Sequence, residues 1–185
     1  MEKDILIVDI NTYKEYACTA YRNFVSNKDV SGFKDMIDYI NSNNPNLVID
    51  AGCGNNIFKQ HIKNIKGFDV REVEEADYIG TYHDMNNIFK ENSADFVISL
   101  GSLGFGPQEI IQQNLEYIYK WLKPQGMAFI IELPDNIATD KDKKNFPLKY
   151  FWNEDKINYF TGILGFDLYS KPLYNLGKLN WVWQK

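Results

Sequence analysis

A carboxylate and two glycines stand close together at Asp50, Gly52 and Gly54, directly after the apolar run at residues 47–49. The run predicts a buried strand, and glycines at alternate positions predict a sharp turn in which φ can be positive. Glycines also let a backbone approach a ligand where a Cβ atom would collide. Because open α/β sheets bind ligands at the carboxyl ends of their strands, we expect a ligand site here, with an acid suited to a cationic group.

The spacing of these glycines argues against a dinucleotide cofactor. The dinucleotide-binding fingerprint has glycines at its first, third and sixth positions. Counted from Gly52, the sixth position is Ile57. This turn therefore does not predict a phosphate bound at the N-terminus of the helix that follows.

A second acid, Asp69, stands near the end of the next expected strand, at residues 66–70. A carboxylate in that position could accept hydrogen bonds from the two hydroxyls of a ribose. Asp50 and Asp69 would then lie on neighbouring strands, at the same edge of the sheet.

Five motifs follow one another along the chain: D-x-G-x-G at residues 50–54, Asp69, His83-Asp84-Met85, the apolar run 94–100 and L-K-P-Q-G at residues 122–126. Their order resembles the class I S-adenosylmethionine-dependent methyltransferases. The resemblance extends over roughly residues 45–185. It implies a cofactor that has no phosphate and offers an ammonium, a carboxylate, a sulfonium and an adenosine.

The resemblance also implies the fold class and the cofactor-binding residues. The fold would be an α/β three-layer sandwich with a mostly parallel seven-stranded sheet of order 3-2-1-4-5-7-6, strand 7 being antiparallel. One methyltransferase domain would span residues 1–185, with a helical lid in 1–44 and a Rossmann-like core in 45–185. The expected cofactor-binding residues are Asp50, Ala51, Gly52, Cys53, Gly54, Asp69, Asp84, Met85, Leu100, Gly101, Tyr16 and Tyr21.

Two positions depart from the family pattern. The third glycine of the fuller motif is Asn56, and the glycine pair before the fifth strand is Gln125-Gly126. Neither change removes an acid, so cofactor binding stays the favoured interpretation. A homologue that binds the cofactor without catalysis stays open.

Apolar periodicity predicts the elements that position these residues. The segment before the core, from Thr12, reads as a helix that either folds over the cofactor as a lid or packs on the sheet. The other expected helices are 31–42, 57–65, 107–122 and 154–164, and the other expected strands are 78–82, 94–100, 127–133, 166–174 and 179–183, the last two forming a hairpin.

Composition limits the partners. The net charge is −5, and the lysines and arginines form no basic stripe, which argues against DNA. Two cysteines, one of them in the turn, fit a reducing cytosol. No apolar run approaches the about 20 residues of a membrane span. We therefore expect a cytoplasmic protein with no metal ion.

Methyl transfer is an in-line displacement, so alignment of the reacting atoms matters more than a strong acid or base. Glu132, Asp135 and Tyr150 are candidates for a base or for orienting the acceptor. We expect methylation of an oxygen or nitrogen of a small molecule, such as a sugar or sugar nucleotide. A protein or RNA acceptor stays an alternative, although no Asn-Pro-Pro-Tyr or Asp-Pro-Pro-Tyr follows the run 94–100.

Overall fold

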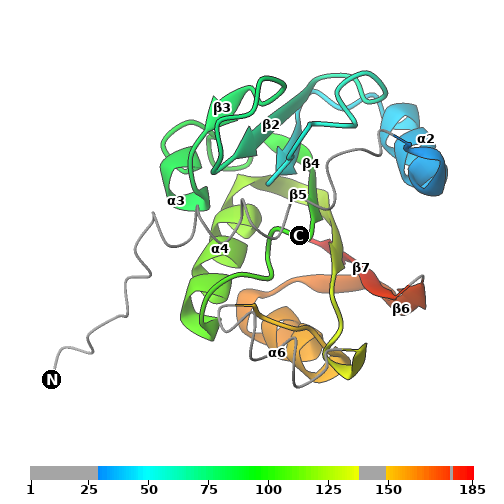
Figure 1. Cartoon of the computed structure of the whole chain (residues 1–185), viewed down its shortest axis with the longest axis vertical. Helices are drawn as coiled ribbons and strands as arrows, with labels where there is room; N and C mark the ends of the chain where they lie inside the picture. Colours follow the sequence, from blue (N-terminus) through cyan, green and yellow to red (C-terminus); the bar gives the residue numbers. More distant parts are fainter. Residues whose placement is uncertain (1–28, 138–148, 176) are drawn as a thin grey trace, which may run out of the picture.

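β1 (Val48–Ala51) lies between two parallel neighbours in a seven-stranded sheet of order β3-β2-β1-β4-β5-β7-β6 (Figure 1). The structure is a computed structural model that describes residues 29–137, 149–175 and 177–185. β7 is antiparallel to both β5 and β6. The sheet order and the antiparallel strand confirm the predicted fold class.

The other strands are β2 (Ile65–Asp69), β3 (Tyr78–Ile79), β4 (Ala94–Leu100), β5 (Leu122–Glu132), β6 (Asp167–Asn175) and β7 (Lys178–Gln184). The helices are η1 (Ser31–Phe33), α2 (Lys34–Ser42), α3 (Tyr82–Met85), α4 (Gln108–Trp121), η2 (Asp135–Ile137) and α6 (Glu154–Leu164). Within the described residues, β1, β2 and β3 follow one another without a helix between them, whereas α3 lies between β3 and β4 and α4 between β4 and β5. α6 precedes the hairpin of β6 and β7.

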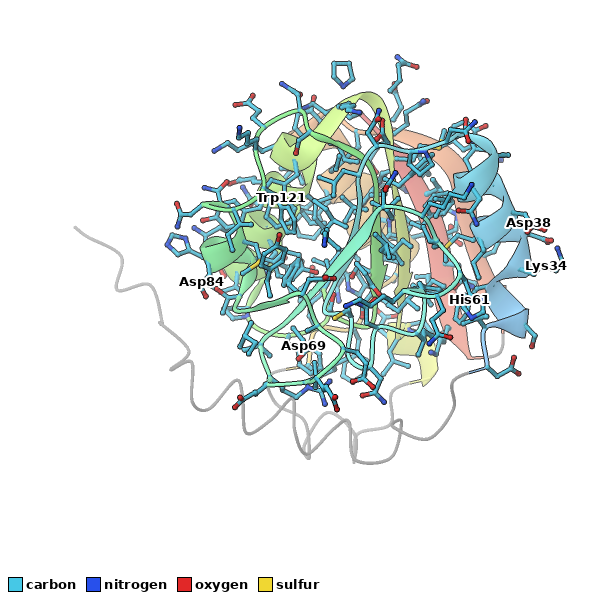
Figure 2. All side chains as sticks on the ribbon, turned by 90° about the horizontal axis from the view of Figure 1, so that it is seen from above. Lys34, Asp38, His61, Asp69, Asp84 and Trp121 are labelled. Carbon is cyan, nitrogen blue, oxygen red and sulfur yellow. The ribbon has the colours of Figure 1, made fainter. Side chains whose placement is uncertain are left out.

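Both faces of β1 are buried. Neighbouring residues of a strand point to opposite faces of the sheet, so they pack in different clusters. Val48 packs in a cluster with Ile37 and Ile40 of α2, whereas Ile49 packs with the buried stripes of α4 and α6. Figure 2 shows Lys34 of α2 on the opposite side of the strands from Trp121 of α4. Strands covered on both faces read as continuous apolar runs, which is how the sequence predicted them.

The helix expected over residues 57–65 is absent, so that prediction was wrong. Consecutive turns link β1 to β2, and Asn56 has a φ of +46° and Asn64 a φ of +57°. Left-handed residues interrupt a right-handed helix. Phe58 and Ile62 are nevertheless buried against α2. The apolar periodicity therefore predicted correctly that these side chains are buried, but it predicted the wrong backbone conformation.

The strand expected over residues 78–82 was also wrong in extent, because β3 ends at Ile79. Thr81 then starts α3: its side chain accepts a hydrogen bond from Asp84 N, while the Asp84 carboxylate accepts from Thr81 N at 2.9 Å. This capping box stabilises a helix start where the sequence had suggested a strand. β5 begins at Leu122 rather than at 127, because Leu122 pairs with Ala94.

Both departures from the family's glycine pattern keep a glycine-like backbone. Asn56 has a φ of +46° and Gln125 a φ of +70°. Asparagine enters this left-handed region at low cost, whereas glutamine does so at about 1–2 kcal/mol. The Asn56 side chain also donates to Glu75 O at 3.0 Å.

We expect Gln125→Gly to raise the free energy of unfolding by up to about 1 kcal/mol, because glycine relieves the strain of the left-handed backbone. The gain is limited because glycine also raises the conformational entropy of the unfolded chain. Asn56→Gly is the matched control and should be neutral or destabilising, since it loses the bond to Glu75. Urea unfolding of both variants measures the difference. A loss of stability in Gln125→Gly would contradict the strain at this turn.

The expected lid residues Tyr16 and Tyr21 lie outside the described residues, so their role and the division at residue 44 stay predictions. Within the described ranges, no helix is both long enough and apolar enough to cross a bilayer.

Candidate functional site

The turn after β1 is bound to β2 by its backbone. Gly52 N and Cys53 N both donate to Phe68 O at 2.9 Å, and Gly52 and Gly54 have φ values of +72° and +52°. A Cβ atom on Gly52 would lie 2.2 Å from Ser102 Cβ. Glycine is therefore required at this position by both conformation and space.

Asp69 is the last residue of β2, and its carboxylate is hydrogen-bonded to this turn. Its Oδ2 accepts from Gly54 N at 2.9 Å, and its Oδ1 accepts from Arg71 N at 2.9 Å and from Arg71 Nε at 3.0 Å. The Asp69 residue is 4% exposed. The structure thus brings the predicted second acid to the predicted turn.

Asp50 is the other acid of this edge, and it is 2% exposed. Burial, followed by the negative charge of Asp69, raises the pKa of Asp50 from 3.8 to about 7. Among the described residues, no hydrogen bond to the Asp50 carboxylate offsets these two effects. A cation placed beside Asp50 would relieve both, because it would favour the ionised carboxylate.

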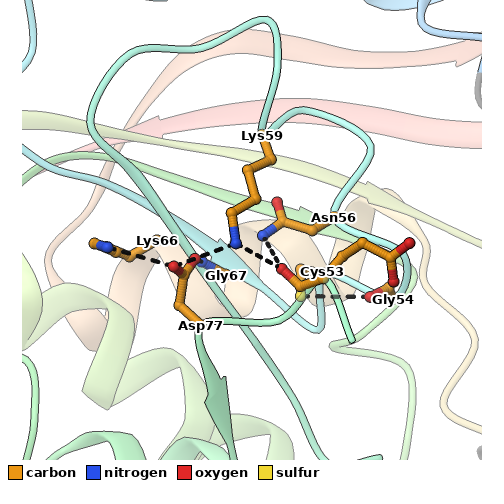
Figure 3. A network of polar contacts seen from close by, with 8 residues as sticks. Cys53, Gly54, Asn56, Lys59, Lys66, Gly67 and Asp77 are labelled. Carbon is orange, nitrogen blue, oxygen red and sulfur yellow. Dashed lines mark hydrogen bonds and ion pairs between the residues drawn. The ribbon is translucent and has the colours of Figure 1, made fainter. Parts of the chain in front are cut away.

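The segment that replaces the expected helix is held by a polar network (Figure 3). Asn56 and Lys59 both donate to Glu75 O, at 3.0 and 2.9 Å. Asp77 accepts from Gly67 N at 2.9 Å and pairs with Lys59 at 3.4 Å. These bonds hold the segment against the loop between β2 and β3, and that loop against Gly67 of β2, without a helix.

A buried hydroxyl cluster joins β1, β4 and α3, and no sequence motif predicted it. Ser102 Oγ donates to Ala51 O at 2.5 Å and lies 2.8 Å from Ser99 Oγ and 2.7 Å from Tyr82 OH. Tyr82 stacks on Trp121 of α4. The feature of the sequence that could have indicated this cluster is the presence of small polar residues at the end of an apolar strand.

The end of β4 offers an open backbone. Gly101 has a φ of +77°, and a Cβ atom built on it would have no neighbour within 4 Å. Its N–H donates to Ile131 O at 2.7 Å, so the residue is held in place. Leu100 beside it is half-buried. Both remain predicted cofactor-binding residues.

Three further predicted residues have structural contacts of their own. The Asp84 carboxylate accepts from Thr81 in the capping box, and Met85 is buried in the core. Cys53 is buried, and burial raises the pKa of its thiol far above the usual range. Cofactor contact by these three residues stays a prediction.

Glu132, a candidate for the base, is buried in an ion pair. Its Oε1 accepts from Leu103 N at 2.7 Å, and its Oε2 lies 3.6 Å from Lys149 Nζ. Burial raises the pKa of Glu132 and lowers the pKa of Lys149, whose ammonium also lies 4.2 Å from the centre of the Phe105 ring. The pair joins β5, the loop after β4 and the segment that starts at Lys149.

The other two candidates differ in their surroundings. Asp135 Oδ2 accepts from Asn153 Nδ2 at 2.6 Å, and Asn153 in turn caps α6. The Tyr150 hydroxyl is buried and has no hydrogen-bond partner among the described residues. Burial raises the pKa of Tyr150 to about 12. A catalytic role for Glu132, Asp135 or Tyr150 stays a prediction.

The fold is shared with several solved methyltransferases. The 1,6-didemethyltoxoflavin-N1-methyltransferase of Burkholderia thailandensis, solved with 1,6-didemethyltoxoflavin and S-adenosylhomocysteine, has a TM-score of 0.69 and 13% identity over 95% of this chain and 86% of that chain. A SAM-dependent methyltransferase of Archaeoglobus fulgidus has a TM-score of 0.70 and 13% identity over 92% of this chain and all of that chain (100%).

A third similar structure is the magnesium protoporphyrin IX methyltransferase of Synechocystis PCC 6803 with bound S-adenosylhomocysteine. Its TM-score is 0.63, with 18% identity over 83% of this chain and 81% of that chain. No family model and no curated protein matches the sequence. At these identities the likeness establishes the fold, which is that of the class I S-adenosylmethionine-dependent methyltransferases.

Proposed function

We propose that this chain is an S-adenosylmethionine-dependent methyltransferase that methylates an oxygen or nitrogen atom of a small molecule. The observation that carries the proposal is the buried Asp50 carboxylate, which has no cationic partner among the described residues and lies close enough to Asp69 for their charges to repel. A buried charge without a partner is costly. A ligand that brings a cation to the end of β1 would supply the partner.

The neighbouring groups suit the rest of such a ligand. Gly101 presents open backbone at the end of β4, because an added Cβ would have no neighbour within 4 Å. Gly52 and Gly54 hold the turn after β1 at positive φ. Asp69 supplies a carboxylate for the ribose hydroxyls of an adenosine. When bound, S-adenosylmethionine supplies a methyl carbon activated by a sulfonium.

The surroundings of the three candidate bases support methyl transfer by alignment of the reacting atoms, rather than by abstraction of a proton from the acceptor. Glu132 is engaged by Leu103 N and Lys149, and Asp135 is engaged by Asn153. Tyr150, with a pKa of about 12, is almost fully protonated at neutral pH. We infer that these residues orient the acceptor, and that its nucleophilic atom is held in line with the methyl carbon.

A small acceptor is supported by two of the similar structures, whose names specify 1,6-didemethyltoxoflavin and magnesium protoporphyrin IX. A net charge of −5 without a basic stripe also disfavours a nucleic-acid acceptor. A sugar or sugar nucleotide stays the expected class.

Titration calorimetry of the full chain with S-adenosylmethionine and S-adenosylhomocysteine tests the cofactor. We expect binding of both, and we expect labelled methyl groups to appear on members of a panel of small hydroxyl and amine compounds. Absence of heat with either compound at millimolar concentration would overturn the proposal. Binding without transfer to any acceptor would favour the non-catalytic alternative.

A further inference from the structure

The Asp69 carboxylate already has as many donors as it can accept. Gly54 N and Arg71 N each donate to it at 2.9 Å. The Arg71 guanidinium adds two more bonds, from Nε to Oδ1 at 3.0 Å and from Nη2 to Oδ2 at 3.4 Å. An ionised carboxylate offers about four acceptor sites. Two backbone and two guanidinium donors therefore fill them.

The pair is also shielded from solvent. The side chains of Arg71 and Asp69 are 12% and 6% exposed. A ribose cannot add its hydroxyls to this carboxylate as a fifth and sixth donor. One pair of donors has to leave first.

The two kinds of donor differ in how easily they can leave. Gly54 N and Arg71 N belong to the backbone at the ends of β1 and β2, where the turn is fixed by the bonds to Phe68 O. The guanidinium is carried on a long side chain whose rotation leaves the backbone in place. Its two N–H groups match the two O–H groups of a ribose in number.

We propose that Arg71 is a specificity-determining residue that closes the ribose-binding carboxylate of Asp69 and opens it only for a ligand with two adjacent hydroxyls. This inference rests on the proposed function. Withdrawal of Arg71 removes its two guanidinium bonds from Asp69, and a ribose with both hydroxyls replaces both of these. A deoxynucleoside can replace only one of these bonds or neither. Either Arg71 then stays on Asp69, or Asp69 loses a hydrogen-bond donor.

The test compares S-adenosylhomocysteine, adenosine and 2′,3′-dideoxyadenosine as ligands of the full chain, by calorimetry or ligand-observed NMR. Arg71→Ala should bind the first two about tenfold more tightly than the wild type, because no charge-assisted bonds need to be broken first. The affinity for 2′,3′-dideoxyadenosine should not rise. Arg71→Lys keeps the positive charge but lacks the paired donors of the guanidinium. Its affinities for the first two ligands should lie between those of the wild type and those of Arg71→Ala.

Lys66→Ala is the matched control. Lys66 lies on the same strand and pairs with Asp77 at 3.3 Å, so the variant removes one positive charge without touching Asp69. It should leave all three affinities unchanged. Arg71→Met, which keeps the aliphatic stem, replaces Arg71→Ala if thermal unfolding shows that the alanine variant does not fold.

The outcomes separate the two proposals. Binding of S-adenosylhomocysteine by the wild type, with equal or weaker binding by Arg71→Ala, would overturn this inference and leave the proposed function standing. An equal gain for adenosine and 2′,3′-dideoxyadenosine would also overturn it, because the gain would then not depend on the hydroxyls. No binding by any variant would overturn both.

Discussion

Gly52→Ala is expected to lower the free energy of unfolding by about 3 kcal/mol or more, the sum of overpacking and left-handed strain. The added Cβ would lie 2.2 Å from Ser102 Cβ and 2.9 Å from Ser102 Oγ, at a φ of +72°. The Ser102 hydroxyl cannot move freely, because it bonds to Ala51 O and contacts Ser99 and Tyr82. Urea unfolding measures the loss.

Gly165→Ala is the matched control for the backbone effect. Gly165 ends α6 at a φ of +76°, and its nearest neighbour to an added Cβ is Tyr119 Oη at 3.7 Å. It should therefore cost only about 1 kcal/mol. In a Ser102→Gly background the cost of Gly52→Ala should fall toward the same value. Equal costs for Gly52→Ala and Gly165→Ala in the wild-type background would contradict the steric account of the turn.

Asp50→Asn is expected to stabilise the ligand-free protein and to abolish its stabilisation by S-adenosylmethionine. The pKa of Asp50 is raised from 3.8 to about 7 in the folded state, so ionisation of the buried group opposes folding. The asparagine variant should gain roughly 2–4 kcal/mol at pH 8, since each tenfold change in an ionisation equilibrium corresponds to about 1.4 kcal/mol. Urea unfolding with and without the ligand measures both effects.

The sign of this effect depends on pH. Below the unfolded-state value of 3.8, Asp50 is protonated in both states, so Asp50→Asn should have no advantage. The advantage should grow as pH rises from 3.8 to about 7 and then stay constant. Destabilisation by Asp50→Asn at pH 8 would show that the structure already satisfies the carboxylate.

Ligand binding by the wild type should also strengthen as pH rises toward 7. A bound cation favours ionised Asp50, so binding below pH 7 has to release a proton from it. We expect affinity for S-adenosylmethionine to fall by up to about tenfold for each pH unit below 7 in the wild type. Asp50→Asn should show a flat profile if residual binding is measurable. A flat wild-type profile would show that Asp50 does not contact the cation.

Much of the fold followed from local patterns. Apolar runs at residues 47–49 and 94–100 predicted strands, and apolar periodicity predicted a helix at residues 154–164, where the structure has α6. The helix expected over residues 57–65 is absent, because Asn56 and Asn64 adopt positive φ values and a polar network holds the turns instead. In such a short segment, buried residues can be spaced as in a helix although the backbone is not helical.

By itself, the sequence placed two acids at strand ends on one edge of the sheet, because parallel strands joined by crossovers have their carboxyl ends along one edge. The sheet order was implied by the resemblance to the class I S-adenosylmethionine-dependent methyltransferases. Only the tertiary structure decided what those acids contact. Ser102 against Gly52, Arg71 folded back on Asp69 and Lys149 against Glu132 are all set by how side chains pack in space. Spacing along a chain specifies the edge of the sheet that a residue reaches, whereas the partner it meets there depends on distances of a few ångströms between packed segments.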